Sequence, residues 1–417
     1  MSVRLVDRVA VAELVEVRRR ETAALLSSDA ARAALAVRGT PLLLLDVGRV
    51  TRQYLRLRRA LPFVRFHYAV KALAHEAVIG ALARAGCDFD VATREELDLV
   101  MRQGALPGRV LHTHPIKKIS EISGAVALGV RTFVVDNEVE LEKFRGAPSG
   151  VRVLVRLAYR SPHAASDLSS KFGVGAHEAE RLVRHAVDLG VCVAGFSFHV
   201  GSQLDDPDRF ADAVEETMAL VEDLESRLPV RFSVLDIGGG FPVAYDVPVS
   251  SIEAIAERIR PSLEVAASRL DVIAEPGRIL AAESMTLVTS VVGIAERDDG
   301  RWYYIDDGVY GSYSNVVAEG VHPLVFAACE LRSRRDDHRW ATVAGPTCDS
   351  TDVVAREVLL PDLAVGDLLA SPVMAAYTSV TATRFNGREL TPIAVVDRRM
   401  VQPAASVSPP VLRRIPA

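Results

Sequence analysis

The chain has 417 residues, of which 49% are hydrophobic and 25% charged, so it can bury a large core and form two domains. Its net charge of -5 offers no basic surface for nucleic acid or for an anionic membrane. The four cysteines are scattered, without a CxxC pair or histidines at zinc-like spacing, and the first twenty residues contain no long apolar run. These features predict a cytoplasmic enzyme with reduced thiols, no metal site, no signal peptide and no membrane span.

Short β-rich runs alternate with helical stretches from Arg65 to Glu275. The helical stretches, such as Ala74–Ala85 and Ala176–Leu189, are rich in Ala, Leu, Glu and Arg at helical spacing. Eight repeats in about 210 residues match a (β/α)8 barrel, whereas an open doubly wound sheet would more typically carry a GxGxxG turn that is absent here. The eight expected strands are Arg65–Lys71, Asp88–Ala92, Arg109–His114, Thr132–Asp136, Val151–Leu157, Gly195–Val200, Ser233–Ile237 and Asp271–Glu275.

After Leu280 the pattern becomes that of an all-β domain. Ser284–Ile294 is rich in Val and Thr, a hairpin-type turn follows at residues 297–300, and Trp302–Ile305 resumes a strand. Further strands are expected at Arg339–Ala344, Asp367–Ser371 and Pro392–Asp397. The predicted fold class is therefore α/β, with a (β/α)8 barrel over residues 46–280 and a β-domain over residues 281–417. Residues 1–45, which end in the strand-like Pro41–Leu45, are expected to join the β-domain.

Lys71 ends the first expected barrel strand, Phe66-His67-Tyr68-Ala69-Val70-Lys71. Parallel barrels keep their chemistry at the C-terminal ends of the strands. A lysine there is suited to form a Schiff base, above all with pyridoxal phosphate. Because a lysine at a strand end is more often structural, this interpretation depends on the residues around it.

Three other strand ends carry residues that suit such a cofactor. Gly238, Gly239 and Gly240 follow the seventh strand, and their backbone N–H groups can close around a phosphate. Gly277 and Arg278 follow the eighth strand, next to the place where barrels form phosphate sites. Glu275 could hold a pyridine nitrogen protonated, and His199, at the end of the sixth strand, could stack on a flat ring or transfer a proton.

The β-domain contains two polar segments in apolar surroundings, Gly345–Asp352 and Ala375–Gly387. In the first, Cys348 stands beside Asp349, so a thiol could donate a proton to a carbanion while the acid binds an amine. A free cysteine is more often a buried structural residue, and the residues alone favour that interpretation.

Seven motifs, in this order, resemble the fold-type III pyridoxal-phosphate decarboxylases of basic amino acids, with the strongest likeness to ornithine decarboxylases. The likeness extends from Pro41 to Asp397, with an alanine-racemase-like barrel implied. The motifs are FHYAVKA, SFHVGSQ, DIGGGFP, AEPGR, DDGVYGS, GPTCDSTD and AAYTSVTATRFNG.

The resemblance implies a role for each matching residue. Lys71 would hold the cofactor, His199 would stack on its ring, and Cys348 would protonate the substrate carbon. Asp349 would bind the distal amine, across the interface of a homodimer whose active sites are shared. The cofactor-binding residues so implied are Lys71, Asp90, Arg156, His199, Ser202, Gly238, Gly239, Gly240, Glu275, Gly277, Arg278 and Tyr377, and Phe385 is placed with Asp349 and Glu319 at the substrate.

Glu319 departs from the pattern of ornithine decarboxylases, which usually have a Tyr-Asp pair where this chain has Ala318-Glu319. Glutamate keeps the charge but is one methylene longer, which would narrow the pocket or shift the preferred position of the amine. The resemblance therefore implies a diamino acid of the ornithine type, with 2,4-diaminobutyrate, lysine or a specialised-metabolism substrate as alternatives. Diaminopimelate decarboxylases typically have glutamate after the cysteine, and Cys348-Asp349 argues against them.

Two other functions use the same framework. An amino-acid racemase would need a second base on the opposite face of the ring, and the thiol–acid pair fits decarboxylation better. An inactive regulatory relative would tend to lose cofactor contacts, whereas Lys71, Glu275, Arg278, Tyr377 and Cys348 are all present.

Overall fold

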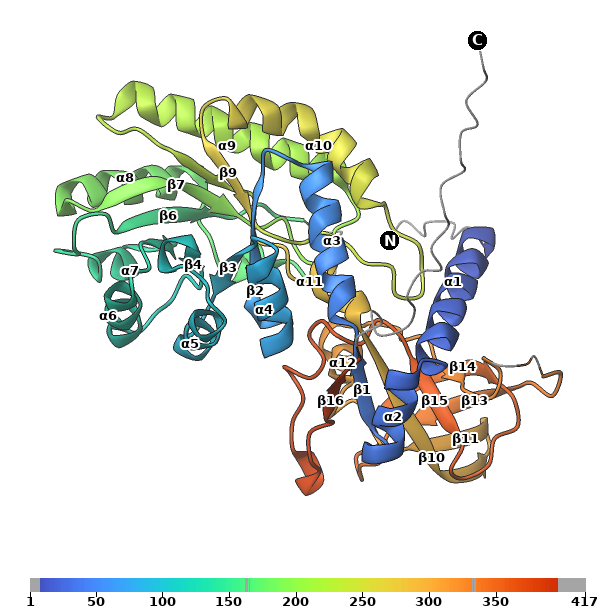
Figure 1. Ribbon diagram of the computed structural model, residues 1–417. Helices are drawn as coiled ribbons and strands as arrows, with labels where there is room; N and C mark the ends of the chain where they lie inside the picture. Colours follow the sequence, from blue (N-terminus) through green and yellow to red (C-terminus); the bar gives the residue numbers. More distant parts are fainter. Residues whose placement is uncertain (1–7, 162–163, 165, 332, 334, 397–417) are drawn as a thin grey trace, which may run out of the picture.

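The computed structural model describes residues 8–161, 164, 166–331, 333 and 335–396 and has two parts, a barrel and a β-sheet domain (Figure 1). Residues 1–7 and 397–417, which the sequence analysis assigned to the β-domain, lie outside the described residues. None of the described helices is long and apolar enough to cross a membrane.

Eight parallel strands close into a barrel, as the alternating pattern predicted. The closing pair is formed by the first and last strands, with Phe66 opposite Ala274. Alternate strand residues, such as Leu154 and Val234, form a separate buried cluster of the kind that fills a barrel interior. The strands are β2 (Arg65–Ala69), β3 (Asp88–Val91), β4 (Val110–His112), β5 (Thr132–Val135), β6 (Arg152–Leu157), β7 (Cys192–Phe198), β8 (Val234–Asp236) and β9 (Asp271–Ala274).

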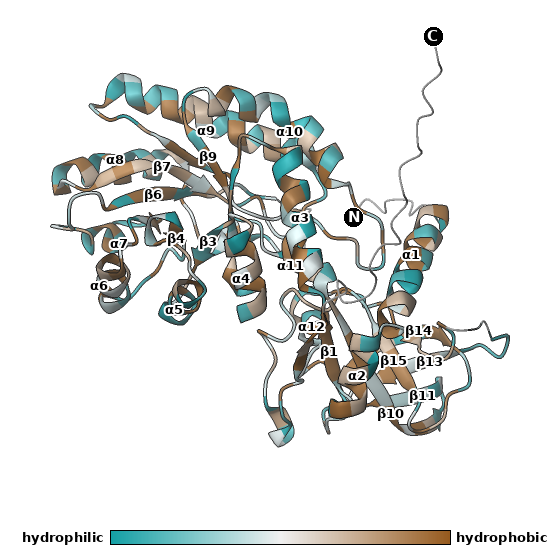
Figure 2. Ribbon diagram, viewed as in Figure 1, coloured by the Kyte–Doolittle hydropathy of each residue, from teal (hydrophilic) through white to brown (hydrophobic). Residues whose placement is uncertain are grey.

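The helices cover the outside of the barrel and turn one apolar stripe towards the strands (Figure 2). In α8 the buried residues Ala179, Leu182, Val183 and Ala186 recur at helical spacing, which places them on one face. These helices are α3 (Val47–Ala60), α4 (Glu76–Arg84), α5 (Arg94–Arg102), α6 (Ile119–Leu128), α7 (Glu138–Glu142), α8 (Ala176–Leu189), α9 (Pro207–Arg227) and α10 (Ile252–Ala267).

The second part is an eight-stranded sheet in the order β12-β15-β10-β11-β13-β14, and its long strand β10 also pairs with β1, which in turn pairs with β16. The turn expected at residues 297–300 joins β10 to β11. Two strands were not predicted. Strand β12 has only two residues, and in β14 the charged pair Arg356 and Glu357 interrupts the apolar alternation. The strands are β1 (Leu42–Leu45), β10 (Met285–Arg297), β11 (Gly300–Ile305), β12 (Phe326–Ala327), β13 (Arg339–Ala344), β14 (Val353–Leu360), β15 (Leu368–Ser371) and β16 (Ile393–Val395).

Further helical segments lie before the barrel and at its junction with the sheet domain. Helices α1 (Arg8–Leu26) and α2 (Asp29–Arg38) precede β1, and α12 (Ser314–Glu319) lies between β11 and β12. The segment α11 (Arg278–Ala281) continues into the 3-10 turn η4 (Ala282–Ser284) and leads from the barrel into β10. Because β1 pairs with both β10 and β16, the barrel is inserted into the β-sheet domain.

Candidate active site

Lys71 lies just beyond the end of β2, in the 3-10 turn η1 (Val70–Ala72), rather than in the strand itself. Its Nζ is 3.5 Å from Oδ2 of Asp90, at the end of β3, and Asp90 also accepts a hydrogen bond from the Thr113 hydroxyl. Desolvation lowers the pKa of Lys71, but attraction by Asp90 and other acidic groups outweighs it, so the pKa lies above its usual value. The amine is therefore held as a cation beside a fixed carboxylate.

The pocket around Lys71 gathers residues from several strand ends, as expected for the C-terminal face of a barrel. Most of the residues predicted to bind the cofactor line it. They are Lys71, His199, Ser202, Gly239, Gly240, Glu275, Gly277, Arg278 and Tyr377.

The glycine loop after β8 leaves no room for side chains. A Cβ on Gly238 would lie 2.1 Å from the Phe198 carbonyl oxygen, and one on Gly240 would lie 2.2 Å from the Gly201 carbonyl oxygen. Both residues also have left-handed φ angles, of 65° and 100°. A Cβ on Gly239 would come within 2.7 Å of the Glu275 carbonyl oxygen. The loop is a backbone cradle that packs directly against the neighbouring strand ends.

The surroundings of Glu275 in this pocket favour the protonated form of its carboxyl group. Burial raises its pKa well above the usual value, and repulsion by Asp236 and Asp90 adds to the effect. Burial likewise raises the pKa of Asp236 to about 6. Asp236 Oδ1 accepts a hydrogen bond of 2.9 Å from the Gly238 amide, and its buried Oδ2 has no partner among the described residues. The pair resembles other buried carboxyl pairs, which cannot both ionise.

His199 is neutral and has a defined tautomer. Its Nδ1 accepts a hydrogen bond of 3.0 Å from the Gly201 amide, so the ring proton is on Nε2. Burial lowers its pKa well below the usual value, and the cations Arg156 and Lys71 lower it further. Arg156 at the end of β6 packs its guanidinium 5.4 Å from the centre of the Phe172 ring. An uncharged flat ring thus faces the pocket.

Arg278 is held on three sides. Its Nη1 donates to the Tyr245 hydroxyl at 2.9 Å, its Nη2 contacts Glu319 Oε1 at 2.6 Å, and its Cζ lies 4.7 Å from the centre of the Tyr377 ring. Tyr377 has a left-handed φ of 55°, and its amide donates to the Ala72 carbonyl next to Lys71. Arg278 is thus a buried residue whose planar guanidinium is held in one orientation in the wall of the pocket.

Three of the four residues expected near the substrate from the β-domain form a separate group, whereas the fourth, Glu319, contacts Arg278. Within the described chain, the pocket around Lys71 is not lined by Cys348, Asp349 or Phe385. Asn386 contacts Cys348 twice, because its Oδ1 accepts from the Cys348 amide at 3.1 Å and its Nδ2 donates to Sγ at 3.3 Å. Within one protomer, the Cys348 thiol is therefore not part of the pocket that contains Lys71.

Asp349 is fixed as a carboxylate by its neighbours. Its Oδ2 accepts from the Tyr310 hydroxyl at 2.6 Å, and its Oδ1 accepts from the amide and hydroxyl of Thr351. These hydrogen bonds, that of Tyr310 first, lower the pKa of Asp349. Phe385 stacks on Tyr310, with ring centres 4.4 Å apart. The result is an oriented anion beside an aromatic pair.

Four residues at these sites were not singled out from the sequence, namely Asp236, Tyr245, Tyr310 and Asn386. Asp236, Tyr310 and Asn386 stand inside the motifs DIGGGFP, DDGVYGS and RFNG, so their position in the motif was a usable signal. Tyr245 lies in an irregular loop, and nothing in the sequence relates it to Arg278.

The pocket fits pyridoxal 5'-phosphate. It offers a lysine amine for the aldehyde, a glycine cradle and a buried arginine for the phosphate, and a carboxyl group with a raised pKa for the ring nitrogen. No group of three or more potential metal ligands occurs among the described residues.

Comparison with known proteins identifies the family. Residues 47–282 match the family model described as pyridoxal-dependent decarboxylase, pyridoxal binding domain. Antizyme inhibitor 2 from Xenopus laevis is 36% identical over 84% of this chain and 79% of its own, and a lysine/ornithine decarboxylase from Selenomonas ruminantium is 33% identical over 86% and 90%.

A solved structure agrees with these matches. The lysine/ornithine decarboxylase from Vibrio vulnificus, complexed with putrescine, has a TM-score of 0.81 and 39% identity, covering 88% of this chain and 96% of that one. These findings confirm the predicted fold class, cofactor and type of enzyme. The chain belongs to the pyridoxal-dependent decarboxylases and is a carboxy-lyase whose cofactor is pyridoxal 5'-phosphate.

Proposed function

We propose that the protein decarboxylates a basic L-amino acid of the ornithine type and releases CO2 and a diamine. The observation that carries the proposal is the pair Cys348 and Asp349, a thiol and an oriented carboxylate held side by side by Asn386 and Tyr310. A carboxylate whose pKa is lowered suits a substrate that ends in an ammonium group. Two of the three relatives named above are lysine/ornithine decarboxylases by name, which supports the same class.

The barrel residues would bind and orient the cofactor. Lys71 would hold it covalently through Nζ, the glycine loop and Arg278 would bind its phosphate, and His199 would lie against its ring. When bound, pyridoxal phosphate supplies the electron sink that accepts the electrons of the bond to the leaving carboxylate. Glu275, whose pKa is raised by burial and by its acidic neighbours, would hold a proton at the ring nitrogen when the cofactor is bound.

The β-domain residues would act on the substrate. Cys348 would return a proton from Sγ to the substrate α-carbon after CO2 has left, and Asp349 would bind the distal ammonium. An ammonium buried without a partner would cost several kcal/mol, so the carboxylate selects for a basic side chain. Because Cys348 and Asp349 do not line the Lys71 pocket of their own chain, we propose a homodimer in which each active site takes these two residues from the partner subunit.

Glu319 would adjust the length of side chain that is accepted. One oxygen contacts Arg278, while the other, Oε2, is buried without a partner among the described residues and is free to accept from an ammonium. Since glutamate reaches one methylene further than aspartate, this oxygen favours a shorter diamino acid, such as 2,4-diaminobutyrate, over ornithine and lysine.

The test is CO2 release from L-ornithine, L-lysine, L-arginine, 2,4-diaminobutyrate and meso-diaminopimelate with pyridoxal phosphate present. We expect turnover of a basic diamino acid, and its loss in Lys71→Ala to below about one thousandth of the wild-type rate, because the covalent hold on the cofactor is removed. Turnover of ornithine equal to or above that of 2,4-diaminobutyrate would contradict the role of Glu319. A yellow protein that is silent across the panel would contradict decarboxylation of basic amino acids and favour racemisation or a regulatory role like that named for antizyme inhibitor 2.

A further inference from the structure

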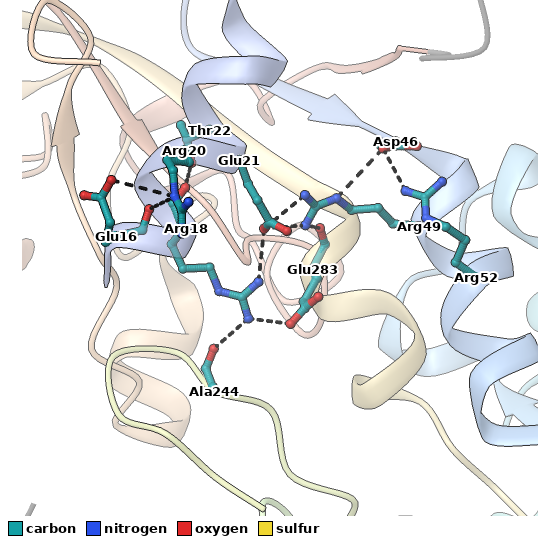
Figure 3. Close-up of polar contacts among 10 residues, drawn as sticks. All are labelled: Glu16, Arg18, Arg20, Glu21, Thr22, Asp46, Arg49, Arg52, Ala244 and Glu283. Carbon is teal, nitrogen blue, oxygen red and sulfur yellow. Dashed lines mark hydrogen bonds and ion pairs between the residues drawn. The ribbon is translucent and has the colours of Figure 1, made fainter. Parts of the chain in front are cut away.

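A buried arginine of the N-terminal helix joins three segments that are far apart in the sequence (Figure 3). Arg18 lies in α1, and its side chain is only 6% exposed. Its Nη2 donates to the Ala244 carbonyl at 3.3 Å and forms an ion pair with Glu283, while Nη1 contacts Glu21 Oε2 at 3.4 Å. A buried guanidinium needs such partners, because leaving its charge unpaired would be costly.

The two distant partners of Arg18 stand in the two segments that carry Tyr245 and Arg278. Ala244 directly precedes Tyr245, whose hydroxyl accepts the hydrogen bond of Arg278 Nη1. Glu283 stands in η4, at the end of the same short helical segment that begins with Arg278. One guanidinium therefore connects the loop that carries Tyr245 to the segment that carries Arg278.

The loop that holds Tyr245 needs external support. Residues 237–251, between β8 and α10, contain no helix or strand. Gln203 fixes Val243 by two hydrogen bonds, of 2.7 and 3.0 Å, and Arg18 fixes the next residue, Ala244. These contacts restrain the backbone up to the position before Tyr245, from which the Tyr245 side chain extends to Arg278.

The ion-pair network around Arg18 also includes Arg49 in α3, a helix of the barrel domain. Glu21 Oε2 also contacts Arg49 of α3 at 3.0 Å, and Arg49 donates to the Glu283 carbonyl at 3.4 Å. Figure 3 shows Arg18, Glu21, Arg49 and Glu283 converging between these helices. These contacts fix the position of helix α1 relative to the segment that contains Arg278 and Glu283.

We propose that Arg18 is a positioning residue for cofactor binding, which acts through Ala244 and Tyr245 on the guanidinium of Arg278. This inference rests on the proposed binding of the phosphate by Arg278. It assigns to α1, which lies outside the matched cofactor-binding region, a part in the affinity for pyridoxal phosphate.

The test is titration of the full-length apoprotein with pyridoxal phosphate, with the dissociation constant followed by absorbance. We expect Arg18→Ala and Tyr245→Phe each to weaken binding about tenfold, the effect of losing one hydrogen bond to a charged group. The dissociation constant of the double variant should not exceed the larger of the two single-variant values, because both substitutions act on the same guanidinium. Arg20→Ala, on the same helix but 68% exposed, is the matched control and should bind as the wild type does.

Pyridoxal without phosphate separates this role from a general loss of structure. Arg18→Ala should leave its affinity unchanged, since only the phosphate end is affected, whereas a damaged fold would weaken both ligands. An unchanged affinity for pyridoxal phosphate in Arg18→Ala, or fully additive effects in the double variant, would overturn the inference. Arg278→Ala is the reference: if it leaves phosphate binding intact, the proposed phosphate site is wrong, and if it weakens binding while Arg18→Ala does not, only the role of Arg18 is wrong.

Discussion

Glu275 and Asp90 are both carboxyl groups at strand ends of one barrel, yet their surroundings give them different tasks. Asp90 lies beside the Lys71 amine, whereas Glu275 lies beside the buried Asp236. Low dielectric and a like charge raise the pKa of Glu275, which favours the protonated form of its carboxyl group. A neutral pyridine nitrogen could accept that proton, which would leave the Glu275 carboxylate paired with the pyridinium.

The proton balance of Asp236 predicts how the stability of the apoprotein depends on pH. The folded protein holds this proton up to about pH 6, whereas an unfolded aspartate releases it near pH 4. Between these values the folded state binds more protons, so the free energy of unfolding falls as the pH rises. Asp236→Asn keeps an acceptor for the Gly238 amide but lacks this penalty. We therefore expect the unfolding temperature of the Asp236→Asn apoprotein to exceed that of the wild-type apoprotein by a few degrees, with the difference growing between about pH 4 and pH 7. Unfolding temperatures that change in parallel with pH would contradict the raised pKa.

At the scale of elements, the glycine loop after β8 depends on backbone approach. A Cβ at residue 239 would meet the carbonyl oxygen of Glu275, which belongs to the adjacent strand end and cannot move alone. We expect Gly239→Ala to weaken pyridoxal phosphate binding by about 100-fold, since the loop must shift away from the phosphate. Gly108→Ala is the control, because a Cβ there meets nothing within 4 Å. Cofactor absorbance after dialysis measures the difference, and full retention in Gly239→Ala would argue against a phosphate cradle.

The sequence predicted the barrel strands well because each is a short apolar run with a helix on either side. The structure places the end of β2 at Ala69 rather than Lys71, since the lysine turns out of the strand into η1. In the β-domain, β14 was missed because Arg356 and Glu357 break its alternation, and Glu357 has a left-handed φ of 53°. Local patterns therefore predict elements that obey one period and miss those with irregular backbone.

The candidate site could be predicted only where a motif carried it. Lys71, His199 and Glu275 stand at strand ends, so the barrel topology alone brings them to one face. The contacts of Tyr245 and Arg18 with the Arg278 region arise from an irregular loop and an N-terminal helix, which no periodicity relates to the barrel.

At the scale of the whole molecule, two inactive variants should restore each other if the active sites are shared. Lys71→Ala and Cys348→Ala are each expected to be inactive as pure proteins. Mixed in equal amounts and allowed to exchange subunits, they should regain about a quarter of the wild-type CO2 release, because half of the dimers are mixed and each has one intact site. Absence of any recovery, with exchange verified by mass, would contradict the shared site.

The insertion of the barrel between β1 and the rest of its sheet has a consequence for biosynthesis. Leu42–Leu45 are all fully buried, and they pair with β10 and with β16, both of which the ribosome makes only after the whole barrel. The apolar strand β1 therefore has no pairing partners until the barrel has been synthesised. Such long-range pairing is slow, and an exposed apolar strand is prone to aggregation in the meantime. The nascent chain is expected to need a chaperone at this strand, and the sheet domain to be completed last although its first strand is made first.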